Sequence, residues 1–197
     1  MATVMNPRAL SSITIGNAVN SVSECLRQIT VRINGSRRSG GSGVVWRADG
    51  LIVTNAHVAD SQELEVAFFD GRILQGRLMA RDPAVDLAVL DVGAGQFLYA
   101  SIRSAREMRA GSLVLAVGNP FDGEGAVSAG IVHRPVGTRH HIFADIRLAP
   151  GNSGGPLADA QGNVIGVNSA VIANLGCAVT SDAVQEFLAR AGVTEAV

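Results

Sequence analysis

Short apolar runs separated by turn residues recur along most of this chain and limit the folds that it can adopt. Turn sequences such as Ala48-Asp49-Gly50 and Asp70-Gly71 lie between neighbouring runs, and each run is short enough for one strand. About a dozen strands at this spacing indicate an all-β protein built from sandwiches or barrels. The expected strands are residues 29–33, 43–46, 51–54, 64–69, 73–80, 87–91, 113–117, 126–133, 142–147, 155–157, 163–169 and 177–179.

Residues 93–111 divide these strands into two groups. This stretch is the weakest strand candidate and carries several serines and arginines, so we expect it to connect two six-strand units. Apolar residues at helical spacing predict a short helix over 17–27 and a closing helix that begins with Asp182 as N-cap and ends at Gly192. The expected division is an N-terminal segment, a first unit, a second unit and a closing helix with tail, bounded as 1–22, 23–105, 106–180 and 181–197.

The composition favours a packed globule and gives no sign of a nucleic-acid or membrane partner. The 197 residues are 47% hydrophobic and 17% charged, with a formal net charge of −1. No apolar run is long enough to cross a bilayer, and the first residues do not have the pattern of a secretory signal. We therefore expect a cytoplasmic protein, unless the sequence is trimmed from a longer one. Cys25 and Cys177 are expected to be buried free thiols, with a single bridge between them as the alternative.

Three short motifs carry groups suited to nucleophilic catalysis. TNAHV places His57 at the end of an expected strand, DPAVDLAVL places Asp86 just before a strongly apolar one, and APGNSGGPL places Ser153 in a glycine-rich turn. A serine hydroxyl needs a base to take its proton, and the base needs a partner that fixes its orientation. Each motif alone is also typical of an ordinary turn or structural residue. Together, among so many strands, they predict a Ser-His-Asp site.

These motifs resemble the three catalytic blocks of the chymotrypsin-fold serine proteases, and more narrowly those of the HtrA (Deg) branch. The segments SGGSGVVWRADGLIVTNAHV, LAVGNPFDGEGAVSAGIV and GNVIGVNSAV resemble the protease domain of that branch in the same order. The resemblance runs from about Val22 to the end of the expected closing helix. It implies two perpendicular six-stranded antiparallel β-barrels with an active site between them. It also implies a serine endopeptidase that works through an acyl-enzyme, with no cofactor and no metal.

The resemblance assigns supporting residues around the serine. It implies that the backbone amides of Gly151 and Ser153 form the oxyanion hole, and that Ser169 hydrogen-bonds the catalytic Asp86. Asn152 stands where digestive trypsin-like enzymes carry an acid that pairs with a new N-terminal amine after zymogen cleavage. Because an amide cannot make that ion pair, we expect loop packing to order the oxyanion hole here.

The same resemblance indicates where a substrate would bind. We expect the backbone of residues 170–172 to form the edge on which a peptide adds as a β-strand. The candidate substrate-binding residues are Arg147, Ala170, Val171, Ile172, Cys177 and Val179. This mostly apolar set favours a small or aliphatic side chain just before the cut, at P1. The alternative is an acidic P1 residue paired with Arg147, which requires that this side chain point inward at a desolvation cost.

The alternatives to a serine protease are a metal site among the histidines and two other functions. A metal site built from His133, His140 and His141 with Asp145 is disfavoured, because adjacent residues on a strand point to opposite faces. The expected partner is a protein or peptide substrate, and the oligomeric state stays open between monomer and homotrimer. The HtrA resemblance covers the protease domain without its usual PDZ domains. Two alternatives remain: a peptide-binding or chaperone-like module of low activity, and a protease dedicated to one partner.

Overall fold

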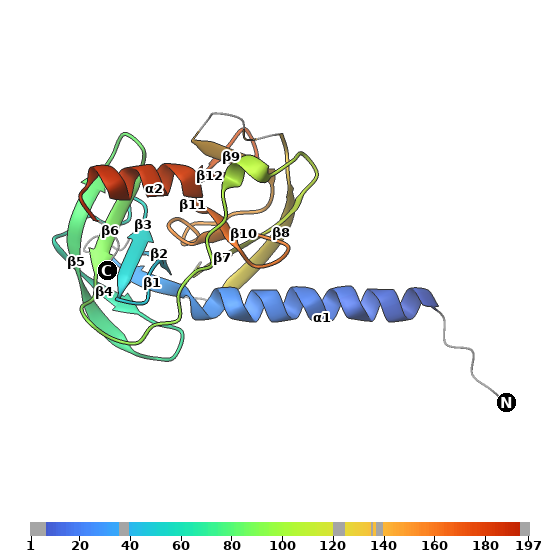
Figure 1. Ribbon diagram of the computed structural model, residues 1–197, viewed down its shortest axis with the longest axis horizontal. Helices are drawn as coiled ribbons and strands as arrows, with labels where there is room; N and C mark the ends of the chain where they lie inside the picture. The colour runs from blue at the N-terminus through green and yellow to red at the C-terminus, as the bar shows by residue number, and fades with distance from the viewer. Residues whose placement is uncertain (1–6, 36–39, 120–124, 135, 137–139, 194–197) are drawn as a thin grey trace.

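Two closed antiparallel β-barrels make up most of the chain, with one helix at each end (Figure 1). The computed structural model describes residues 7–35, 40–119, 125–134, 136 and 140–193. The expected all-β fold of two six-stranded barrels is confirmed.

The first barrel has the strand order β1-β2-β3-β6-β5-β4, and pairing of β1 with β4 closes it. Its strands are β1 Thr30–Asn34, β2 Gly41–Val45, β3 Leu51–Thr54, β4 Glu63–Ala67, β5 Ile73–Asp82 and β6 Leu87–Asp91. Strands β3 and β6 are neighbours, with Thr54 opposite Ala88. This register brings the residues that follow β3 close to those that precede β6.

The second barrel repeats this arrangement. Its strand order is β10-β11-β12-β9-β8-β7, and pairing of β10 with β7 closes it. Its strands are β7 Leu113–Gly118, β8 Ala126–Val132, β9 His141–Asp145, β10 Pro156–Asp159, β11 Val164–Ile172 and β12 Leu175–Thr180. Strand β9 ends at Asp145, two residues before the end expected from the sequence, so Arg147 lies outside the strand.

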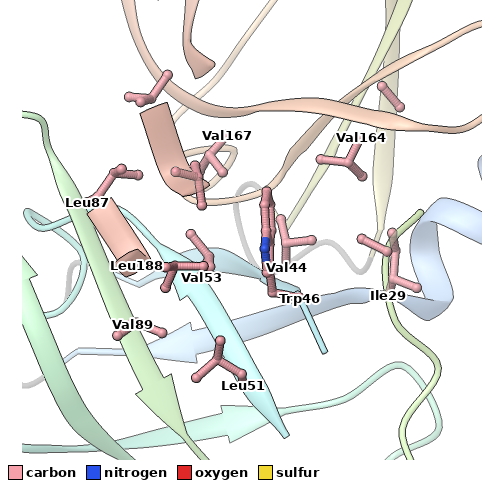
Figure 2. Close-up of a cluster of buried hydrophobic side chains, with 14 of the residues drawn as sticks. Ile29, Val44, Trp46, Leu51, Val53, Leu87, Val89, Val164, Val167 and Leu188 are labelled. Carbon is pink, nitrogen blue, oxygen red and sulfur yellow. The ribbon is translucent and has the colours of Figure 1, made fainter. Parts of the chain in front are cut away.

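Apolar side chains cover both faces of the central strands, and those on one face hold the two barrels together. On β6, Leu87 and Val89 belong to the core between the barrels, whereas Ala88 and Leu90 face the interior of the first barrel. Figure 2 shows the core between the barrels, where Trp46 lies among valines and leucines of both barrels. Each fully buried side chain of this kind stabilises the fold by roughly 1.5–3 kcal/mol. Burial on both faces explains why these strands read as continuous apolar runs.

The N-terminal helix is longer than its sequence pattern predicts. Helix α1 spans Pro7–Gln28, whereas apolar spacing indicated only 17–27. Val22 and Leu26 pack against the core between the barrels, but Gly16 and Asn17 are exposed, and Figure 1 shows the helix extending away from the barrels. Exposed positions of this kind need no apolar stripe, so periodicity could not reveal that the helix begins before residue 17.

The closing helix α2, Ser181–Arg190, packs against both barrels, but its N-cap differs from the prediction. Thr180 is the N-cap, and its hydroxyl accepts a hydrogen bond from the Ala183 N–H. The Asp182 carboxylate instead accepts hydrogen bonds from Ser104 Oγ at 2.8 Å and the Ala105 N–H at 2.9 Å. These bonds tie α2 to the connection between the barrels, which contains a short 3-10 helix, η1 (Ala105–Glu107).

The two cysteines differ from each other. Both thiols are free, Cys177 is buried in β12, and Cys25 is exposed on α1. The expectation of two buried thiols is therefore wrong for Cys25, which lies on the solvent side of the helix.

Candidate active site

His57 and Asp86 form a close pair at one end of the first barrel. His57 lies in the turn after β3, and its Nδ1 is 2.9 Å from Asp86 Oδ1 and 3.0 Å from Oδ2. The backbone N–H of His57 also donates to Oδ1 at 3.2 Å. With both contacts made by Nδ1, Nε2 is the ring nitrogen left to exchange a proton with another group. The imidazole is about half exposed, so a substrate can reach it.

Asp86 is fixed by its backbone as well as by its side chain. Its φ of +55° lies in the left-handed region, which Asp tolerates better than most residues. The Asn55 side chain donates to the Asp86 carbonyl at 2.9 Å, and the Ser169 hydroxyl donates to Asp86 Oδ2 at 2.6 Å. Burial alone raises the pKa of this carboxyl, but the hydrogen bonds from His57 and Ser169 outweigh it and hold the pKa below its usual value. The carboxylate is therefore charged near neutral pH.

Ser153 lies in a turn that only glycine-rich sequence can form. A Cβ on Gly154 would lie 2.0 Å from the Ser42 carbonyl oxygen, and its φ is +86°. The Asn152 N–H donates to the Ala149 carbonyl at 3.0 Å, and Gly151 has a φ of +100°, which is the pattern of a type II turn. The Asn152 side chain closes the same turn, because its Oδ1 accepts from the Ala149 N–H at 3.1 Å.

Two backbone amides of this turn have no acceptor among the described residues. The N–H groups of Asn152, Gly154 and Gly155 donate to the carbonyls of Ala149, Asn168 and Asn152. Within the residues that the structure describes, the N–H groups of Gly151 and Ser153 donate to none. Unpaired amides beside a nucleophile are the donors that an oxyanion requires.

The hydrogen-bond partner of the Ser153 hydroxyl is Ser169 and not His57. The hydroxyl donates to the Ser169 carbonyl oxygen at 3.1 Å, and no hydrogen bond joins it to the imidazole in the described ranges. Ser169 therefore touches two predicted catalytic residues, through its hydroxyl to Asp86 and through its carbonyl to Ser153. Catalytic hydrogen bonds are often completed only when substrate binds.

A pocket of about 200 Å³ opens beside Ser153. Its lining consists of Leu148, Ala149, Pro150, Asn152, Ser153, Asn168, Ser169, Ala170 and Val171. Of the predicted substrate-binding residues, Ala170 and Val171 belong to this lining. Sequence reasoning did not identify Asn168 as a lining residue. The one sign of it in the sequence is that a polar residue follows the apolar run at the start of β11.

The other predicted substrate-binding residues are not part of this lining. Arg147 and Ile172 are exposed, while Cys177 and Val179 are buried in β12. Burial, with a smaller contribution from the Asp86 charge, raises the pKa of the Cys177 thiol to about 11, so the thiol is protonated and unreactive near neutral pH. Arg147 therefore supplies no charge to the pocket wall.

The end of β11 forms an open sheet edge next to the pocket. Ala170, Val171 and Ile172 pair with β12 on one side, whereas β10 pairs with β11 only as far as Val167. Among the described residues no strand covers the other side, which leaves backbone groups available for an added strand.

The histidines of the second barrel do not form a metal site in the described ranges. No group of three His, Cys, Asp or Glu side chains lies close enough to hold an ion there. Burial and the neighbouring His140 lower the pKa of His141, which disfavours its charged form.

Of the helices in the part of the chain that the structure describes, none is long and apolar enough to cross a membrane.

Comparisons with known proteins show the family to which the chain belongs. A family model described as a trypsin-like peptidase domain matches residues 41–167. A protein of Brucella suis, named a probable periplasmic serine endoprotease and DegP-like, is 40% identical over 148 residues, covering 71% of this chain and 29% of the relative. A protein of the same name from Halomonas elongata is 37% identical over 147 residues, covering 71% of this chain and 31% of the relative.

A solved structure gives the same result. The serine endoprotease from Yersinia pestis matches with a TM-score of 0.80 and 30% sequence identity, over 87% of this chain and 65% of that chain.

This chain spans 29–31% of the length of the two curated relatives from Brucella suis and Halomonas elongata. Both relatives are named as periplasmic, and this finding overturns the expectation of a cytoplasmic protein, which rested on the lack of an export signal in the sequence.

Proposed function

Since the chain belongs to the trypsin-like peptidase family, we propose that it is a serine endopeptidase of the HtrA, or DegP-like, type, with Ser153, His57 and Asp86 as its catalytic residues. The observation that carries this proposal is the Asp86–His57 pair, which Ser169 links to Ser153. In the turn that holds Ser153, two amides donate to no acceptor among the described residues. The proposed substrates are proteins, and the proposed location is the periplasm, by analogy with the named relatives.

The proposed reaction follows from the charges and hydrogen bonds of the site. Ser153 Oγ leaves the Ser169 carbonyl by rotation about its Cα–Cβ bond and attacks the peptide carbonyl, while His57 Nε2 takes the hydroxyl proton. Asp86 stabilises the imidazolium, and the amides of Gly151 and Ser153 donate to the oxyanion. His57 then gives the proton to the leaving amine, which leaves an acyl ester on Ser153. Water that loses its proton to His57 hydrolyses this ester.

The pocket supports a preference for small or aliphatic P1 side chains. Leu148, Ala170 and Val171 give it apolar walls, and its lining contains no charged side chain. The acidic alternative is less favoured, because Arg147 is exposed and outside the lining. The open edge of β11 would bind the substrate backbone as an added strand. Main-chain hydrogen bonds of this kind accept many sequences, which suits a protease of broad specificity.

The test is cleavage of an unfolded protein such as casein, followed by a peptide library that reports the P1 residue. We expect cleavage after small or aliphatic residues by the parent and none by Ser153→Ala. A peptide-binding module is the second candidate, favoured by the hydrogen bond from Ser153 to Ser169 rather than to His57. Peptide binding without cleavage by the parent would support that module and contradict the endopeptidase.

A further inference from the structure

A buried serine of the first barrel lies behind the Ser153 turn. Ser42, in β2, is fully buried. Its Oγ donates to the Gly151 carbonyl at 2.8 Å and accepts from the Asn119 backbone N–H at 2.9 Å and Nδ2 at 3.2 Å. Its own N–H donates to the Ser153 carbonyl at 2.8 Å. A hydroxyl has one donor and two acceptor sites, so this one is fully used.

These bonds fix the peptide plane next to the Gly151 amide. That plane joins Gly151 to Asn152, and the Ser42 hydroxyl and the Asn119 N–H, at 3.3 Å, both donate to its carbonyl oxygen. Its N–H end is held by Ala149. A type I turn would need a negative φ at Gly151, and a change between the two turn types rotates the peptide that carries the Gly151 N–H. Glycine itself permits both signs of φ, so the orientation of the Gly151 N–H depends on how firmly the rest of the turn is held.

The same hydrogen bonds continue to the N-terminal helix. Asn119 Oδ1 accepts from the Gly125 N–H at 3.0 Å, and the Gly125 carbonyl accepts from Arg27 Nε at 2.7 Å. Gly125 is packed against this side chain, because a Cβ there would lie 2.8 Å from Arg27 Cγ. An unbroken path therefore runs from α1, through Asn119 and Ser42, to the Gly151 carbonyl.

We propose that Ser42 and Asn119 form a clamp that positions the Gly151 amide for the oxyanion, and that Arg27 of α1 holds this clamp in place. The proposal rests on the proposed endopeptidase function. Ser42 and Asn119 are positioning residues, since neither belongs to the pocket lining. Asn152 cannot make the ion pair that orders this turn in zymogen-derived enzymes. In its place, the Ser42 hydroxyl of the first barrel holds the turn through the Gly151 carbonyl.

Kinetics of Ser42→Ala test the clamp. Loss of one oxyanion donor lowers kcat about 100-fold or more, and an amide oriented correctly a tenth of the time lowers it about 10-fold. We therefore expect a fall in kcat of about 10- to 100-fold with little change in KM, and recovery of most of kcat in Ser42→Thr, which keeps a hydroxyl. Ser181→Ala is the matched control, because it removes a buried hydroxyl that donates to the Arg103 carbonyl, far along the chain from the turn. An unchanged kcat in Ser42→Ala would overturn the clamp.

Hydrogen exchange gives a second readout that needs no activity. The Asn152 N–H belongs to the clamped peptide, so we expect its exchange to rise about 10-fold in Ser42→Ala and in Asn119→Ala but not in Ser181→Ala. Equal exchange in all variants would contradict the clamp even if the parent cleaves peptides. If the parent cleaves nothing, the proposed function fails, and this exchange rate still decides whether Ser42 restrains the turn.

The connection to α1 has its own pair of variants. Arg27→Ala removes the bond to Gly125, whereas Glu24→Ala removes only the salt bridge from Glu24 to Arg27 Nη1 at 3.2 Å. We expect Arg27→Ala to lower kcat in the same direction as Ser42→Ala and by less, and Glu24→Ala to leave kcat unchanged. Equal kcat in parent and Arg27→Ala would show that the helix does not support the clamp.

Discussion

Gly154 offers the sharpest test of how the Ser153 turn is built. In Gly154→Ala the new Cβ would lie 2.0 Å from the Ser42 carbonyl oxygen and 2.3 Å from Thr54 Oγ1, and both atoms belong to buried residues of the first barrel. A left-handed φ costs roughly 1–2 kcal/mol for a residue with a side chain. Overpacking of a filled site costs roughly a further 1–3 kcal/mol. The expected loss of unfolding free energy is therefore about 2–5 kcal/mol.

A matched variant separates these two costs. Gly71 has a φ of +87°, close to the +86° of Gly154, but a Cβ there meets nothing within 4 Å. Gly71→Ala should lose only the roughly 1–2 kcal/mol of backbone strain. Urea unfolding of both variants measures the difference, and cleavage of a peptide substrate should fall in Gly154→Ala alone. Equal stabilities would refute the argument that the first barrel packs directly against the turn.

Three further predictions concern the proposed catalytic residues and the pocket. Asp86→Asn should lower kcat by about four orders of magnitude in a peptide assay, because an amide leaves the His57 tautomer wrongly set; a fall of less than tenfold would contradict this role. Ser169→Ala should raise the pKa of Asp86. The pKa of Asp86 is lower in the folded state than in the unfolded state, so its carboxylate stabilises the fold at pH values above the unfolded-state pKa. This stabilisation is lost as the pH falls through the folded-state pKa. The stability deficit of Ser169→Ala, measured by urea unfolding, should therefore shrink below about pH 4. Arg147→Ala should leave the P1 profile of a peptide library unchanged, and loss of an acidic preference in this variant would show that the pocket is wrongly assigned.

The strands could be predicted because their sequence pattern and their packing have the same cause. Leu87 to Leu90 form an unbroken apolar run since one face packs between the barrels and the other inside the first barrel. At exposed positions such as Gly16 and Asn17 of α1, no apolar stripe is present for periodicity to detect. The predicted N-cap of α2, Asp182, is wrong because its carboxylate accepts hydrogen bonds from residues 104 and 105, which are distant in the sequence.

The candidate site was predictable for a similar reason and incomplete for another. His57, Asp86 and Ser153 lie in short motifs whose residue types indicate their chemistry, and the β3–β6 pairing brings the first two together. Cys177 and Val179 are buried and are not part of the pocket lining, so their role in substrate binding stays a prediction. The contact of Ser42 with Gly151 joins two barrels, so no local pattern could have predicted it.

Whether Ser153 is an activated nucleophile can be measured with a fluorophosphonate probe and mass spectrometry, because only a serine activated by a neighbouring base reacts readily with the probe. We expect one covalent adduct, located on Ser153, that is lost in Ser153→Ala and forms much more slowly in Asp86→Asn. If the folded parent protein stays unlabelled, or if the adduct forms on any other residue, Ser153 is not the nucleophile.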